Sequence, residues 1–139
     1  MEAPRILLVD DEILFVEAMA KILRRHGMEV LSAGDGAAAL AQLSSRRPDV
    51  VVLDLKMPGM DGMEVLRQAK VLSPATPVIV LTGHGTVEAG QEALRLGAFD
   101  FEMKPARVGH LVEVIREALR SRALAEEALR GEGGGEGGG

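Results

Sequence analysis

Short runs of aliphatic residues alternate along this chain with segments whose apolar residues recur every three or four positions. The runs are typical of β-strands and the segments of amphipathic helices. Runs such as residues 78–82 (VIVLT) lack polar alternation, which indicates strands buried on both faces. Such an alternation predicts parallel strands joined by right-handed helical crossovers, with helices on both faces of one sheet. The predicted class is therefore an α/β three-layer sandwich.

Glycines and prolines mark the boundaries of the predicted elements. Gly27 is expected to close the first helix in a left-handed conformation, and Pro48, Pro58 and Pro77 interrupt helical continuity. Residues 49–55 (DVVVLDL) form the most apolar run and are the expected central strand. The predicted strands are 5–10, 28–33, 49–55, 78–82 and 99–103, and the predicted helices lie at 12–26, 37–45, around 63–69, at 87–96 and from 108 onward.

The C-terminal residues differ in composition from the rest. Residues 131–139 read GEGGGEGGG, which buries no side chain and predicts a flexible tail. We expect one domain over 1–121 and an extension of the last helix over 122–130. That extension is weakly apolar, so it fits either a docking or dimerising helix or a solvated one.

Composition excludes several classes of protein. The chain has no cysteine, which rules out disulfides, thiolate catalysis and cysteine-ligated metals. Three Phe without Trp or Tyr leave no base-stacking platform, and a net charge of −5 argues against direct nucleic-acid binding. No apolar run is long enough to span a membrane, and residues 1–12 lack the pattern of a signal peptide. The expected location is the cytoplasm, with no membrane partner.

Polar residues whose side chains could take part in binding or catalysis follow the predicted strands. Asp10 and Asp11 follow the first, Asp54 ends the third, Thr82 ends the fourth and Lys104 follows the fifth. Carboxyl ends of parallel strands meet at one edge of the sheet, where ligands bind. Clustered carboxylates without His or Cys favour a hard cation such as Mg²⁺, which commonly binds together with phosphate. Asp54 is then a candidate nucleophile, with Thr82 and Lys104 donating to phosphoryl oxygens.

Taken singly, several of these residues have structural explanations. Asp11 has the position of a helix cap, Thr82 suits a strand, and a lysine such as Lys104 is usually solvated. Asp54 is harder to explain structurally, because a carboxylate at the end of an apolar strand is costly to desolvate without a partner. Their joint position at the strand ends favours the functional interpretation.

Four motifs carry a family resemblance: LLVDDE around Asp10, VVVLDLKMPGMDG around Asp54, VIVLTGHGT around Thr82 and GAFDFEMKP around Lys104. Through these motifs the chain resembles a receiver domain of the two-component response-regulator family, from Met1 to about Leu119. The resemblance implies a flavodoxin-like five-stranded parallel sheet in the order 2-1-3-4-5, with five helices.

The same resemblance implies a role for each site residue. Asp54 is expected to accept a phosphoryl group, and Thr82 and Lys104 to contact its oxygens. Asp11, Asp54 and the carbonyl of Lys56 are expected to hold Mg²⁺, with Asp10 assisting. The resemblance therefore implies a signalling switch that catalyses only its own phosphorylation and dephosphorylation, rather than a metabolic enzyme.

Further residues resemble the parts of a switch. Thr82 is expected to move toward the phosphoryl group, and Phe101 to rotate into the space that it leaves. Lys56 and His84 resemble positions that modulate loss of the phosphoryl group, and we predict that Lys56→Asn changes its half-life. The Lys104–Pro105 bond resembles a cis peptide bond of the family.

Three functional interpretations stay open at this point. The first is a stand-alone receiver, and the second is a receiver cut from a larger transcriptional regulator. The third is an aspartyl-nucleophile phosphatase of the haloacid dehalogenase kind, which is disfavoured because Lys56 stands where that family needs a second Asp. The receiver interpretations imply a sensor histidine kinase or histidine phosphotransfer protein as donor. They also imply a downstream protein on the face of the fourth helix, fifth strand and fifth helix, and leave homodimerisation on activation open.

Overall fold

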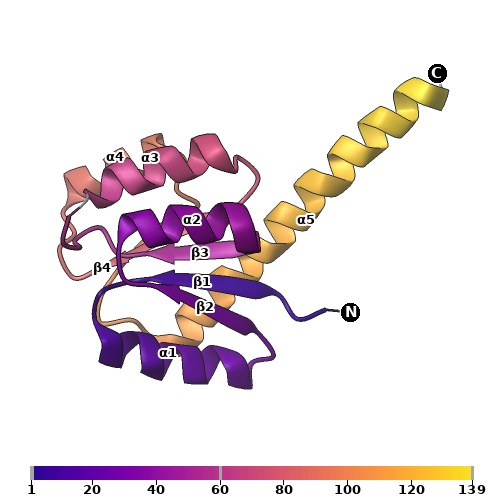
Figure 1. Cartoon of the computed structure of the whole chain (residues 1–139). Helices are drawn as coiled ribbons and strands as arrows, with labels where there is room; N and C mark the ends of the chain where they lie inside the picture. Colours follow the sequence, from indigo (N-terminus) through magenta and orange to yellow (C-terminus); the bar gives the residue numbers. More distant parts are fainter. Residues whose placement is uncertain (1, 60, 139) are drawn as a thin grey trace.

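A computed structural model of the chain describes residues 2–59 and 61–138. Strands and helices alternate along it without exception (Figure 1). The strands are β1 (Arg5–Val9), β2 (Glu29–Ala33), β3 (Val50–Leu53), β4 (Val78–Thr82) and β5 (Asp100–Met103). The helices are α1 (Ile13–Arg25), α2 (Gly36–Arg46), α3 (Gly62–Leu72), α4 (Val87–Arg95) and α5 (Val108–Gly138).

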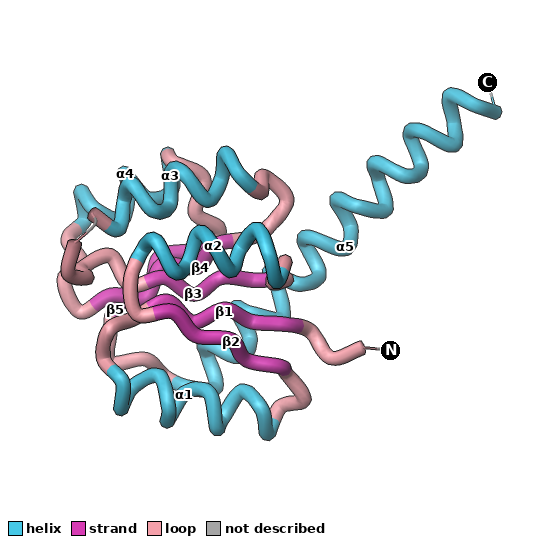
Figure 2. The backbone as a smooth tube through the Cα atoms, viewed as in Figure 1, coloured by secondary structure: helices cyan, strands magenta, loops and turns pink. Residues whose placement is uncertain are grey.

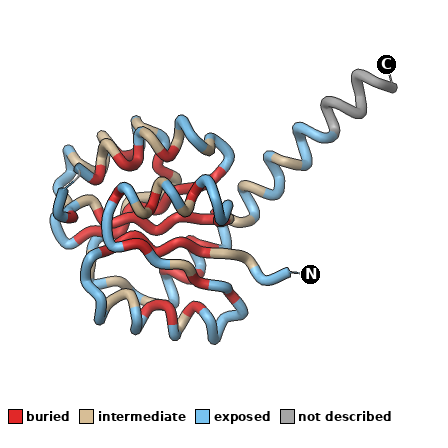
Figure 3. The backbone as a smooth tube through the Cα atoms, in the orientation of Figure 1, coloured by how far each residue is buried: buried red, intermediate tan, exposed pale blue. Residues whose placement is uncertain are grey.

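The strands form one parallel sheet in the order β2-β1-β3-β4-β5 (Figure 2). This confirms the predicted fold class and strand order. In register, Leu8 lies beside Val52, and Val52 lies beside Ile79. Every residue of β3 and β4 is buried, which accounts for their continuous apolar sequences (Figure 3).

Successive strand residues point to opposite faces and supply two separate cores. Ile6, Leu8, Val52 and their neighbours pack against α1 and α5, whereas Leu7, Val9, Val51 and their neighbours pack against α2, α3 and α4. The result is the three-layer sandwich seen in Figure 1. The buried members of both cores are Ala, Val, Leu, Ile and Met, so the sheet is covered on both faces and its carboxyl edge is left for a site.

Local chemistry sets where the helices begin and end. Asp35 Oδ1 accepts the Ala38 N–H at the start of α2, and Asp61 Oδ1 accepts the Met63 N–H at the start of α3. Gly27 follows α1 with φ +81°, the left-handed conformation expected of it. The other helix boundaries lie within a few residues of those expected.

Helix α5 continues well past the sheet as one helix (Figure 1). Where it leaves the domain, Arg122 Nη1 lies 3.0 Å from the Pro48 carbonyl oxygen and 3.3 Å from Asp49 Oδ1. The helix is described through Gly138, past the extension predicted over 122–130. The side chains of 131–138 and the whole of Gly139 lie outside what the structure describes, so the flexible tail and the domain boundaries stay predictions.

No helix in the described part of the chain combines the length and the apolar character needed to cross a membrane.

Candidate functional site

Four polar side chains predicted from the sequence come together at the carboxyl edge of the sheet. Asp10 follows β1, Asp54 follows β3, Thr82 ends β4 and Lys104 follows β5. Backbone bonds hold these strand ends in place: the Asp54 N–H donates to the Val9 oxygen, and the Lys104 N–H donates to the Thr82 oxygen, each at 2.9 Å. The side chains of Asp10 and Asp54 are both only 4% exposed, so their carboxylates are almost fully removed from water.

The Lys104 ammonium lies among the acids. Its Nζ is 2.6 Å from Asp10 Oδ2, 3.2 Å from Glu12 Oε1 and 3.6 Å from Asp54 Oδ2. Burial alone would lower the pKa of Lys104, but its hydrogen bonds to Asp10 and Glu12 and the nearby negative charges raise it. The pKa of Asp10 is raised chiefly by burial, against the opposing effect of Lys104. Lys104 is therefore charged and partly neutralises the acids.

The cluster of acidic side chains in the structure differs in one member from the cluster expected from the sequence. Side-chain oxygens of Asp10, Glu12 and Asp54 lie within 4.8 Å of one another, whereas the Asp11 side chain is exposed and is not in this group. Glu12 was not singled out from the sequence, although it completes the acidic triplet at residues 10–12. The predicted role of Asp11 as a ligand is untested and stays a prediction.

This donor set suits a hard divalent cation. All three side chains offer carboxylate oxygens, the ligands that Mg²⁺ prefers. With the carboxyls ionised, three negative charges face the single positive charge of Lys104 and leave an excess of two. The Asp54 Oδ1 atom also accepts the Lys56 N–H at 3.3 Å, which keeps the Lys56 backbone beside the carboxylate. The residues present therefore fit a magnesium ion.

The predicted switch residues lie beside this group. Thr82 is fully buried, and its Oγ1 accepts the His84 N–H at 3.1 Å. The Phe101 ring packs against Gly85 and Gly90: a Cβ added at Gly90 would lie 3.2 Å from its Cδ1. His84 and Lys56 are exposed. The Lys104–Pro105 peptide bond is cis.

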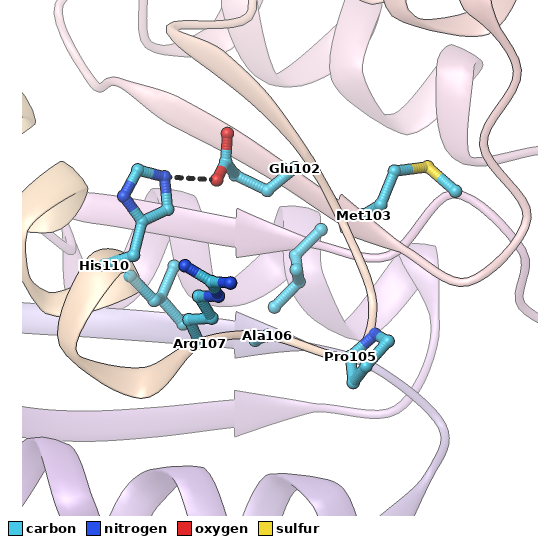
Figure 4. Close-up of a pocket in the computed structure, with 8 residues that line it drawn as sticks. Glu102, Met103, Pro105, Ala106, Arg107 and His110 are labelled. Atoms are coloured by element: carbon cyan, nitrogen blue, oxygen red, sulfur yellow. Dashed lines mark ion pairs between the residues drawn. The ribbon is translucent and has the colours of Figure 1, made fainter.

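A separate pocket of about 220 Å³ lies beyond Pro105, between β5 and the start of α5 (Figure 4). His110 Nε2 lies 2.5 Å from Glu102 Oε1 across it. Burial and the charge of Asp100 raise the pKa of Glu102, while His110 acts in the opposite direction. The pocket contains neither Asp54 nor Lys104, so it is a feature of the face predicted for output rather than of the acidic site.

Residues 6–116 match the response regulator receiver domain family. The chain belongs to this family. A curated relative is the C4-dicarboxylate transport transcriptional regulatory protein DctD of Rhizobium meliloti, 38% identical over 125 residues that make up 90% of this chain and 27% of DctD. The nitrogen assimilation regulatory protein NtrX of Azorhizobium caulinodans is 37% identical over 124 residues, 88% of this chain and 27% of NtrX.

Solved receiver structures agree with the fold. A CheY-like response regulator receiver domain protein from Methanospirillum hungatei has a TM-score of 0.86 at 31% identity, over 89% of this chain and 99% of that one. NtrX from Brucella abortus in complex with ADP has a TM-score of 0.85 at 38% identity, over 91% of this chain and 29% of that one. This receiver domain thus spans about a quarter of the length of DctD and of the Azorhizobium NtrX.

Proposed function

We propose that this receiver domain accepts a phosphoryl group on Asp54. The observation that carries the proposal is the buried Asp54 carboxylate, held at the end of β3 beside Asp10, Glu12 and the Lys104 ammonium. Burial of a charged carboxylate, here 4% exposed and next to other acids, costs free energy. Its presence therefore indicates a functional role or a cation partner. Phosphoryl transfer requires little beyond in-line positioning and charge neutralisation, which this site can supply.

The proposed reaction forms and breaks one bond at phosphorus. An Asp54 oxygen attacks the phosphorus of a phosphohistidine, the P–N bond breaks, and the imidazole leaves with its electron pair and takes up a proton. Lys104 donates to the phosphoryl oxygens, and the Thr82 hydroxyl turns from the His84 N–H toward them. Water later cleaves the acyl phosphate, releasing inorganic phosphate and restoring the carboxylate.

Magnesium is the proposed cofactor of this step. Asp10, Glu12 and Asp54 are its candidate side-chain ligands, and we retain Asp11 and the Lys56 carbonyl from the sequence prediction. Bound there, the ion would supply neutralising charge to the phosphoryl group as a Lewis acid. The carboxylates of this chain would orient it, and burial of Asp10 and Asp54 would strengthen that interaction by excluding water.

Two exposed surfaces support the proposed partners. Ile13 and Leu14 begin α1 beside the acidic triplet and are 71% and 82% exposed, which suits docking of a sensor kinase or histidine phosphotransfer protein. Val87 and Leu94 on α4 and Met103 on β5 are exposed on the face proposed for a downstream protein.

Relatives such as DctD favour a receiver module of a larger transcriptional regulator over a stand-alone one. Homodimerisation on activation stays a prediction, which molar mass measured against concentration would test.

The proposed acceptor is tested by intact-protein mass after incubation with Mg²⁺ and a small acyl phosphate. The parent is expected to gain one phosphoryl group, and Asp54→Asn none, because the amide is not a nucleophile of comparable strength. The matched control is Asp35→Asn, the same change at an exposed helix cap that remains able to cap α2. An adduct that persists in Asp54→Asn, or none in a folded parent that binds Mg²⁺, would contradict the proposal.

Lys56 is proposed to control the lifetime of the acyl phosphate. Its N–H is bound to Asp54 Oδ1 and its side chain is exposed, so we propose that this cationic side chain hinders the approach of water to the carboxylate. We expect Lys56→Asn to shorten the half-life by about tenfold, equivalent to about 1.4 kcal/mol in the barrier. Decay of the mass adduct after removal of the donor measures this, with His84→Ala in parallel. Unchanged decay in both variants would refute control by these two positions.

A further inference from the structure

The Lys104 ammonium contacts an aromatic ring as well as carboxylates. Its Nζ lies 4.2 Å from the centroid of the Phe15 ring, within the range of about 6 Å in which a cation is attracted to an aromatic face. Phe15 is the third residue of α1, and its partly buried side chain packs against the core between α1, α5 and the sheet. Packing against the core therefore fixes the ring in a position where its face contacts the Lys104 ammonium.

The carboxylates around Lys104 are not equivalent. Asp10 at 2.6 Å and Glu12 at 3.2 Å are within hydrogen-bond distance of Nζ, whereas Asp54 at 3.6 Å is beyond it. Glu12 is 63% exposed and Asp10 only 4%, so one acid draws the ammonium outward to water and the other draws it inward. The position of the ammonium near Asp54 depends on the balance between them.

We propose that Phe15 is a positioning residue. Its ring keeps the Lys104 ammonium beside the buried Asp10 and Asp54 rather than near the exposed carboxylate of Glu12. The ring removes water from the ammonium and replaces part of its solvation by attraction to the aromatic face. Without that face, the ammonium regains water and moves toward the exposed carboxylate of Glu12. This inference rests on the proposed function, because it matters for the reaction only if Lys104 must reach a phosphoryl group on Asp54.

The attraction can be removed while the volume is nearly kept. Phe15→Leu leaves an apolar side chain without a π face, and Phe15→Tyr keeps the ring. A cation–ring attraction of about 0.5 to 2 kcal/mol corresponds to a rate effect of about 2- to 30-fold. We therefore expect Phe15→Leu to form the Asp54 adduct several-fold more slowly than the parent, and Phe15→Tyr to remain within about twofold of it.

Phe99 provides the matched control. It is also partly buried and packed against the same core, so Phe99→Leu measures the general cost of losing a ring there. If Phe15→Leu and Phe99→Leu slow adduct formation equally, or if Phe15→Tyr is as slow as Phe15→Leu, the ring does not act through Lys104 and the proposal is wrong.

A double-mutant cycle in stability tests the contact without any phosphoryl chemistry. Urea unfolding is measured for the parent, Phe15→Leu, Lys104→Met and the double variant, all in EDTA. We expect Phe15→Leu to change the unfolding equilibrium constant at least twofold less once Lys104 is gone, and strict additivity would overturn the proposal. If the parent forms no adduct, the proposed function fails while the cycle still reports on the contact. An adduct in the parent with an additive cycle refutes only the role of Phe15.

Discussion

Replacement of Gly62 by alanine is expected to destabilise the domain by about 3 kcal/mol, because the new methyl group would meet backbone rather than a movable side chain. A Cβ at Gly62 would lie 2.3 Å from both the Cα and the carbonyl oxygen of Leu55. The same two residues are joined by the hydrogen bond from the Gly62 N–H to the Leu55 oxygen, 3.0 Å long. Relief of the clash would break that bond.

The damage from Gly62→Ala would extend to the site. Leu55 follows Asp54 directly, and Gly62 begins α3 next to the capping residue Asp61. Urea unfolding measures the loss of stability as a lower midpoint at unchanged slope. Gly34→Ala is the control, since a Cβ at Gly34 meets no atom within 4 Å, and it should change stability by less than about 0.5 kcal/mol. Equal midpoints for the two variants would contradict the steric argument.

The strands and helices were predictable because their local signals agree with the fold. The continuous apolar run in β3 can be satisfied only by burial on both faces, and the glycine after α1 ends the helix as its sequence indicates. The order of the strands could not be predicted from local signals. It came from the family resemblance, because no property of a single strand's sequence specifies its neighbours.

The site was predictable to the level of which strand ends take part. Asp10, Asp54 and Lys104 meet because parallel strands bring their carboxyl ends to one edge. The direction of each side chain was not predictable, which is why Glu12 rather than Asp11 joins the acid group. Among three consecutive acids, the backbone conformation of the loop decides which carboxylates turn toward Asp54 and Lys104. The approach of Phe15 to Lys104 likewise joins residues far apart in sequence and has no local signal.

Lys104→Met is expected to destabilise the domain in the absence of magnesium and to increase the stabilisation that added magnesium provides. In EDTA the variant loses the cation that lies between Asp10, Glu12 and Asp54. Removal of one partner from a buried ion pair leaves uncompensated charge, so we expect a loss of about 3 kcal/mol in the free energy of unfolding. Phosphorylation should slow by about 10²-fold, as for loss of a donor to a developing oxyanion.

Added Mg²⁺ should stabilise Lys104→Met more than it stabilises the parent. In the parent, the ammonium already neutralises part of the acid group, so the ion gains less by binding and meets repulsion from a nearby positive charge. A ligand that binds only the folded state stabilises it by about 2.7 kcal/mol at a concentration 100 times its dissociation constant. Tighter binding in the variant therefore appears as a larger rise in melting temperature at the same Mg²⁺ concentration.

Lys21→Met is the matched control, because Lys21 is exposed on α1 and forms none of these ion pairs. It should follow the parent in EDTA and in Mg²⁺ alike. If Lys104→Met gains no more from Mg²⁺ than Lys21→Met does, the ammonium and the ion do not compete for the same carboxylates. Lys104 and the ion would then contact different oxygens of the acidic group, and the predicted competition between them would be wrong.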